Sequence, residues 1–180
     1  MKHFWLVILT YLTTLHADTP TQIYQLYQKG EYIASCNLGL QHFKEFESNE
    51  AYVSIYAFSC LKSDQIDRLD TPLMKLSQSS EARANASYFS MLVMQKKLLI
   101  QALYDNLSLK SLKFPTSSHL LSKIFTLYCN NPQSEKSIKE YTDLTNIRIS
   151  YKLYTTQLNG QKTIAIDEYY DKILTQHHVY

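Results

Sequence analysis

ARANASYFSMLVMQKKLLIQALYDNL, residues 82–107, is the longest segment of the chain in which apolar residues keep a helical spacing. Apolar side chains recur three, four and seven positions apart, as they do along an α-helix. They fill one face and an adjoining one: Tyr88, Leu92, Leu99, Leu103 and Leu107, and Phe89, Val93, Ile100 and Tyr104. A helix that is apolar over so much of its circumference is normally enclosed by other elements. We therefore expect this helix at the centre of a helical bundle.

The segments on either side of this helix predict further helices. Between residues 20 and 130 apolar residues keep the helical spacing, and the pattern is interrupted by polar breaks and by prolines such as Pro72 and Pro115. Three glycines and four prolines in 180 residues are few for a turn-rich all-β protein. Residues 18–132 therefore predict an α-helical domain.

The C-terminal segment, residues 133–180, has a different pattern. In IRISYKLYTTQL, residues 147–158, β-branched or aromatic residues alternate with polar ones, and QKTIAIDEYY, residues 161–170, alternates again. Asn159 and Gly160 between them suit a two-residue turn in which both φ angles are positive. We expect a β-hairpin at residues 147–170. The predicted fold class is mostly α, with antiparallel helical hairpins in an array or an irregular bundle and a C-terminal β-hairpin.

Residues 26–40, LYQKGEYIASCNLGL, carry an aromatic residue, a Gly-acid-Tyr turn and a small residue in that order. This order resembles the middle of a tetratricopeptide repeat. The resemblance implies that Gly30 turns one helix into the next, that Tyr32 packs between them and that Ser35 is the close-contact position. A second, looser helix pair follows at residues 51–77, near the expected spacing of about 34 residues. Proteins of that family are usually scaffolds that hold partner segments in a concave groove, and the whole layout is similar to small exported bacterial proteins of unassigned function.

The first 17 residues combine Lys2, an apolar run from Phe4 to Leu12 and a small residue at Ala17, as secretory signal peptides do. Twelve helical residues cover roughly 18 Å, too little for a hydrocarbon core about 30 Å thick. We therefore expect cleavage after Ala17 and a periplasmic or secreted mature chain without a transmembrane span. The alternative is that residues 4–17 are retained as an amphipathic or core segment.

Export changes how the three cysteines are interpreted, because disulfides form in oxidising compartments. Cys36 and Cys60 lie on consecutive predicted helices, so one interpretation is a disulfide between them. Another is that all three cysteines, Cys129 included, are unpaired buried residues. A reactive or metal-binding role is a third interpretation, but the chain has no Cys-x-x-Cys and no Cys–His spacing typical of zinc. We expect no metal site.

No motif in the sequence predicts catalysis or a cofactor. There is no Gly-x-Ser-x-Gly and no phosphate loop, and the Ser-x-x-Lys at Ser59–Lys62 lacks its companion motifs. We therefore expect no enzyme activity and no cofactor. Removing Lys2 leaves 17 basic against 16 acidic residues, which gives no reason to expect nucleic-acid binding. Acidic residues do gather at residues 63–81 and lysines at residues 86–129, and these groups could guide association or pair within the fold.

Fifteen tyrosines suit an interaction surface, because tyrosine tolerates half-burial. Our leading hypothesis is an exported, non-enzymatic protein-binding or scaffold protein of the cell envelope, with an unidentified protein partner. The partner segment would lie in a helical groove or add a strand to the hairpin edge. The candidate contacts are Tyr24, Tyr27, Tyr32, Tyr52 and Tyr56. One alternative is a small-ligand carrier or enzyme with a pocket between the long helix and the hairpin. Another is a structural subunit of an envelope complex.

Overall fold

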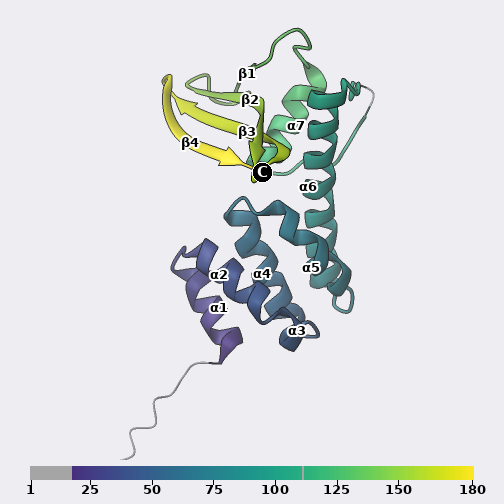
Figure 1. Cartoon of the computed structure of the whole chain (residues 1–180), viewed down its shortest axis with the longest axis vertical. Helices are drawn as coiled ribbons and strands as arrows, with labels where there is room; N and C mark the ends of the chain where they lie inside the picture. Colours follow the sequence, from purple (N-terminus) through teal and green to yellow (C-terminus); the bar gives the residue numbers. More distant parts are fainter. Residues whose placement is uncertain (1–17, 111) are drawn as a thin grey trace, which may run out of the picture.

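The computed structural model describes residues 18–110 and 112–180, so the predicted signal peptide, residues 1–17, lies outside the described residues. The helices are α1 (Thr19–Gln28), α2 (Tyr32–Gln41), α3 (Phe43–Phe46), α4 (Glu50–Lys62), the short 3₁₀ helix η1 (Ile66–Leu69), α5 (Asp70–Lys75), α6 (Ser80–Asp105) and α7 (Leu120–Asn130). The strands β1 (Lys139–Thr142), β2 (Ile149–Leu158), β3 (Gln161–Tyr170) and β4 (Ile173–Val179) form one antiparallel sheet in the order β1-β2-β3-β4. Helices α1 to α5 lie at one end of the molecule and the sheet with α7 at the other, while α6 runs along both (Figure 1).

The prediction of a mostly α protein with a C-terminal β-hairpin is wrong, because the chain is a mixed α/β protein with a four-stranded sheet. The hairpin itself is present as β2 and β3, and the turn residues Asn159 and Gly160 have φ angles of 51° and 78°. Both of its outer edges are covered, one by β1 and the other by β4. Two strands alone bury too little apolar surface to be stable, and the added strands supply the rest of the sheet.

Helix α6 is the element that both ends of the molecule share. Ser79 caps its start, with the hydroxyl oxygen accepting a hydrogen bond from the Ala82 N–H at 3.0 Å. Its buried side chains include Phe89 and Leu92 in the first half and Leu99 in the second. The helix contacts α4 and α5 at one end and α7, β2 and β3 towards the other. The expected central helix is therefore enclosed by helices on one side and by a sheet on another. In the part of the chain that the structure describes, no helix is both long and apolar enough to cross a membrane.

A carboxylate fixes α7 to the sheet. Asp143, in the loop between β1 and β2, accepts hydrogen bonds from the Lys123 ammonium of α7 and the Tyr151 hydroxyl of β2, each at 2.7 Å. The hydrogen bond from Lys123 holds the pKa of Asp143 well below its ordinary value, with Thr145 and Tyr151 contributing. Asp143 is therefore ionised at neutral pH and joins the last helix to the sheet.

Helices α1, α2 and α4 pack closely around small residues. Gly30, in the turn between α1 and α2, has a φ angle of 76°, and the Tyr32 ring lies edge-on to the ring of Tyr27 at 5.4 Å. The buried Ser35 hydroxyl donates to the backbone carbonyl of Ile23 at 3.0 Å. These are the residues that the tetratricopeptide resemblance singled out.

Gly39 is a second close-contact position in α2. A Cβ atom at Gly39 would lie 2.4 Å from the ring of the buried Tyr56, so only glycine fits there without movement of α4.

The structure contains a disulfide between Cys36 of α2 and Cys60 of α4, while Cys129 is a free thiol at the end of α7. Burial raises the pKa of the Cys129 thiol, which favours its unreactive protonated form. The two disulfide cysteines are fully buried, so the bond lies inside the helical end of the molecule.

We predict that loss of the Cys36–Cys60 disulfide lowers the free energy of unfolding by about 3 kcal/mol, because the bond restricts the unfolded chain. Urea denaturation of the oxidised protein, of the reduced protein and of the Cys36→Ser/Cys60→Ser double variant measures this difference. Cys129→Ser is the matched control and should leave the reductant sensitivity unchanged. Equal stability of the oxidised protein and the double variant would contradict the prediction.

Candidate functional site: the cleft between the helices and the sheet

A cleft of about 720 Å³ opens between the helical end of the molecule and the sheet. Residues of α1, α4 and α6 line one side, residues of β3 and β4 line the other, and residues 118–120 at the start of α7 also contribute. The C-terminus lies beside it, at the centre of the view in Figure 1. Because side chains alternate along a strand, Gln176, His178 and Tyr180 all point from β4 into this space.

The helical side of the cleft is aromatic. Tyr27 of α1, Phe58 of α4 and Tyr88 of α6 are half-buried there, and the rings of Phe58 and Tyr88 lie 6.4 Å apart. Half-buried aromatic rings keep apolar surface available to a bound molecule. Of the predicted tyrosine contacts, Tyr27 lines the cleft. The ring of Tyr32 packs against the ring of Tyr27.

The other predicted tyrosine contacts lie elsewhere. Tyr24 is 47% exposed on α1 and its hydroxyl accepts a hydrogen bond from the amide of Gln28. Tyr52 and Tyr56 are only 2% and 1% exposed, so they belong to the core and present no surface to a partner. Tyr52 also donates a hydrogen bond to the backbone carbonyl of Gly39 at 2.9 Å, which fixes its hydroxyl inside the protein. Sequence alone did not distinguish core tyrosines from surface ones, because both types sit at helical spacing.

His178 connects the two sides of the cleft. Its Nδ1 lies 2.8 Å from a carboxylate oxygen of Asp64, just after α4, and its Nε2 lies 3.0 Å from the side-chain oxygen of Gln176. Both ring nitrogens therefore face acceptors, an arrangement that the doubly protonated imidazolium satisfies. The hydrogen bond with Asp64 raises the pKa of His178 against the opposing effect of burial. Asp64 itself has a φ angle of 62°, which turns the chain out of α4 towards the sheet.

A second histidine in the cleft, His119, has its pKa shifted in the opposite direction. His119 is the N-cap of α7, and its Nδ1 accepts a hydrogen bond from the Leu121 N–H at 3.2 Å. Burial lowers the pKa of His119 to about 4, so the ring is neutral at neutral pH. The Tyr180 ring lies near both imidazoles, stacked on His178 at 5.9 Å and tilted against His119 at 6.3 Å. The cleft thus holds, beside an aromatic ring, one imidazole whose pKa is raised and one whose pKa is lowered.

His177 lies on the other face of the sheet, although it precedes His178 directly. Its Nδ1 is 2.6 Å from Asp167 of β3, and the Tyr154 hydroxyl donates to the same carboxylate at 3.2 Å. Both histidines belong to β4. Each is next to an aspartate, on opposite faces of the sheet.

The acidic and basic groups found in the sequence pair within the fold. Lys96 of α6, which is 3% exposed, lies 2.5 Å from Asp67 of η1, and Lys97 lies 3.8 Å from Asp70. Within residues 18–110 and 112–180, no three His, Cys, Asp or Glu side chains gather closely enough to hold a metal ion. Among the same residues, neither imidazole of the cleft is hydrogen-bonded to a serine, threonine or cysteine side chain.

We predict opposite pH effects from the two cleft histidines. The pKa of His178 is raised above 6.5, so the stability it contributes is fully present below pH 6.5 and is lost as the pH rises through its folded-state value. The pKa of His119 is lowered to about 4, so its contribution is present above pH 6.5 and is lost as the pH falls towards 4. NMR titration of the imidazole signals measures both midpoints, and Asp64→Asn should lower that of His178. A His178 midpoint that Asp64→Asn leaves unchanged would contradict this account.

In comparisons with protein-family models, curated proteins and solved structures, nothing matches this chain. The tetratricopeptide resemblance therefore stays a prediction that rests on residues 26–40.

Proposed function

We propose that this protein is a non-enzymatic binding protein that holds an extended segment of a partner protein along β4, with side chains of that segment in the cleft. One observation carries the proposal: β4 is an edge strand, and the residues on its inner face line the cleft. Among the described residues, no further strand pairs with the outer edge of β4. Main-chain hydrogen bonds to that edge and side-chain contacts in the cleft would act together.

The arrangement revises where strand addition would take place. The hairpin edges named in the sequence analysis are covered by β1 and β4, so the free edges of the sheet belong to those two strands. β1 has four residues, whereas β4 has seven and borders the cleft. A partner segment on β4 gains both a longer ladder and the aromatic wall formed by Tyr27, Phe58 and Tyr88.

The compartment is part of the same proposal. A buried disulfide between Cys36 and Cys60 is typical of proteins that fold in an oxidising environment, which supports export to the periplasm or beyond. The partner would then be an envelope or secreted protein. Its segment would carry apolar side chains for the aromatic wall.

We predict that peptides selected on the oxidised protein from a random library bind in the cleft. Tyr88→Ala should lower their affinity about tenfold or more, because central aromatic contacts dominate such interfaces. Tyr24→Ala is the matched control, since that tyrosine is exposed on α1 outside the cleft, and it should change affinity by no more than about twofold. Fluorescence polarisation of labelled peptides measures both.

Hydrogen exchange then separates strand addition from simple groove binding. Bound peptide should slow exchange of amide protons in residues 173–179 and leave those of β1 unchanged. The proposal fails if no peptide is enriched over an unrelated control protein, or if selected peptides bind wild type and Tyr88→Ala equally. If the peptide slows amide exchange in β1 instead of β4, then β4 is not the edge to which the peptide binds.

A further inference from the structure

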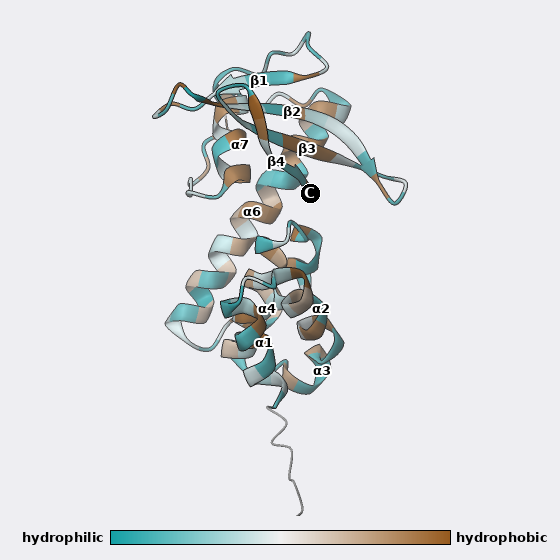
Figure 2. Cartoon of the chain, turned by 90° about the vertical axis from the view of Figure 1, so that its left-hand side faces the viewer, coloured by the Kyte–Doolittle hydropathy of each residue, from teal (hydrophilic) through white to brown (hydrophobic). Residues whose placement is uncertain are grey.

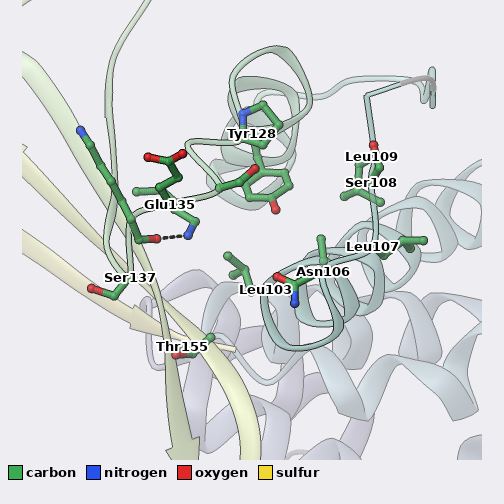
Figure 3. A pocket seen from close by; sticks show the side chains of 14 residues that line it. Leu103, Asn106, Leu107, Ser108, Leu109, Tyr128, Glu135, Ser137 and Thr155 are labelled. Carbon is green, nitrogen blue, oxygen red and sulfur yellow. Dashed lines mark hydrogen bonds between the residues drawn. The ribbon is translucent and has the colours of Figure 1, made fainter.

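A second cavity, of about 440 Å³, lies at the C-terminal end of α6. Its walls are residues 102–109 at the end of α6 and just after it, Tyr128 of α7, residues 132–139 before and at the start of β1, and Thr155 of β2 (Figure 3). We call it the α6-end pocket. It shares no lining residue with the cleft. It occupies the place between the long helix and the hairpin where the sequence analysis put the alternative ligand site.

The Tyr128 hydroxyl opens into this pocket. Tyr128 is 5% exposed, and no described residue is hydrogen-bonded to its hydroxyl. Figure 3 shows the hydroxyl directed into the open space towards Asn106 and Leu103. Burial raises the pKa of Tyr128, so the group remains a hydroxyl that can donate. The side chain of Tyr128 is buried while its hydroxyl is accessible from the pocket, so this donor is available to a bound molecule.

Lys139, at the start of β1, is a second such group. It is 7% exposed, and its ammonium donates to the backbone carbonyl of Lys136, the dashed line in Figure 3. An ammonium has three N–H donors, so two are left without an acceptor among the described residues. None of the described carboxylates forms an ion pair with Lys139, although Glu135 lines the same pocket. Burial lowers the pKa of Lys139, the sign of a cation whose charge is poorly compensated.

The other residues that line the pocket indicate what kind of ligand it suits. Asn106, whose φ angle of 57° ends α6, presents its side-chain amide to the pocket without a hydrogen-bond partner among the described residues. Leu103, Leu107 and Leu109 supply apolar surface beside it. Donors therefore gather near an apolar wall, which suits a molecule with an anionic end and an apolar body.

We propose that the α6-end pocket binds a small organic carboxylate. Its carboxylate is held by the Lys139 ammonium, with the Tyr128 hydroxyl and the Asn106 amide as further partners, and its apolar body lies against Leu103 and Leu107. An organic carboxylate fits better than a free phosphate, because Glu135 also lines the pocket and repels a dianion more strongly than a single charge, and because Leu103 and Leu107 offer a surface to an apolar body. The assignment is independent of the partner segment proposed for the cleft.

NMR titration of the oxidised protein with hexanoate, hexanamide and inorganic phosphate tests the assignment. Hexanamide has the same apolar body as hexanoate but no charge. Hexanoate should shift the amide signals of residues 103–109 and 134–139 and bind at least about tenfold more tightly than hexanamide, because hydrogen bonds to a charged group are the stronger ones. Phosphate should bind more weakly than hexanoate.

Lys139→Met keeps the length of the side chain and removes its charge, so it should bring hexanoate and hexanamide to within about twofold of each other. Tyr128→Phe should weaken hexanoate about two- to tenfold. Lys44→Met, on the exposed surface of α3, is the matched control and should change nothing. Equal binding of hexanoate and hexanamide to the wild-type protein would overturn the assignment whatever the variants do. Tighter binding of phosphate, or no shifts at these residues with any probe, would overturn it as well.

Discussion

The fold depends on one constraint, which is that a single helix has to be buried by two different partners. Helix α6 packs Phe89 and Leu92 against the helical end and Leu99 against α7 and the sheet. Between these stretches the helix passes the junction, and there two of its buried residues, Gln95 and Lys96, are polar. Gln95 donates to the backbone carbonyl of Pro115 at 3.1 Å, and Lys96 pairs with Asp67. The side-chain oxygen of Gln95 is the buried atom that no described residue satisfies. Cavities open on both sides of this junction, the cleft beside Tyr88 and the α6-end pocket beyond Ala102.

Local signals account for what the sequence predicts of this fold. The turn at Asn159 and Gly160 needs two positive φ angles, and alternation in β2 and β3 needs only their own residues. β1 and β4 carry no comparable signal. β1 reads Lys-Glu-Tyr-Thr and is hydrophilic in Figure 2, in contrast to the hydrophobic middle of β3. In β4 the apolar residues Ile173 and Leu174 stand side by side rather than alternating. These two strands exist because β2 and β3 offer them an edge, so the sheet follows from long-range pairing that spacing cannot reveal.

The candidate sites show the same limit more strongly. Asp64 and His178 are 114 residues apart, and their contact needs both the reversal of the chain after α4 and the addition of β4 to the sheet. In the sequence, Asp64 is only one of the acidic residues that gather at residues 63–81. A disulfide between Cys36 and Cys60 is one of three interpretations of the cysteines, because consecutive antiparallel helices can bring such positions together. Tyrosine content predicts an interaction surface in general terms, but burial decides which tyrosines take part. Tyr52 and Tyr56 are not part of such a surface, and Gly39 explains why. Because Gly39 has no side chain, α2 approaches α4 closely enough to enclose both rings.

The two cavities differ in how their polar groups are satisfied, and this difference separates the two proposals. In the cleft, His178, His119 and Asp64 all have protein partners, so an occupant gains contacts mainly with aromatic rings and with the edge of β4. A long chain segment can use such a surface, because it brings its own main-chain donors and acceptors. In the α6-end pocket, Tyr128 and Lys139 keep donors without acceptors. The Lys139 ammonium has one backbone acceptor and no ion pair with a described carboxylate, so an anion there gains charge-assisted hydrogen bonds. The α6-end pocket therefore suits a small ligand, and the cleft suits a protein segment.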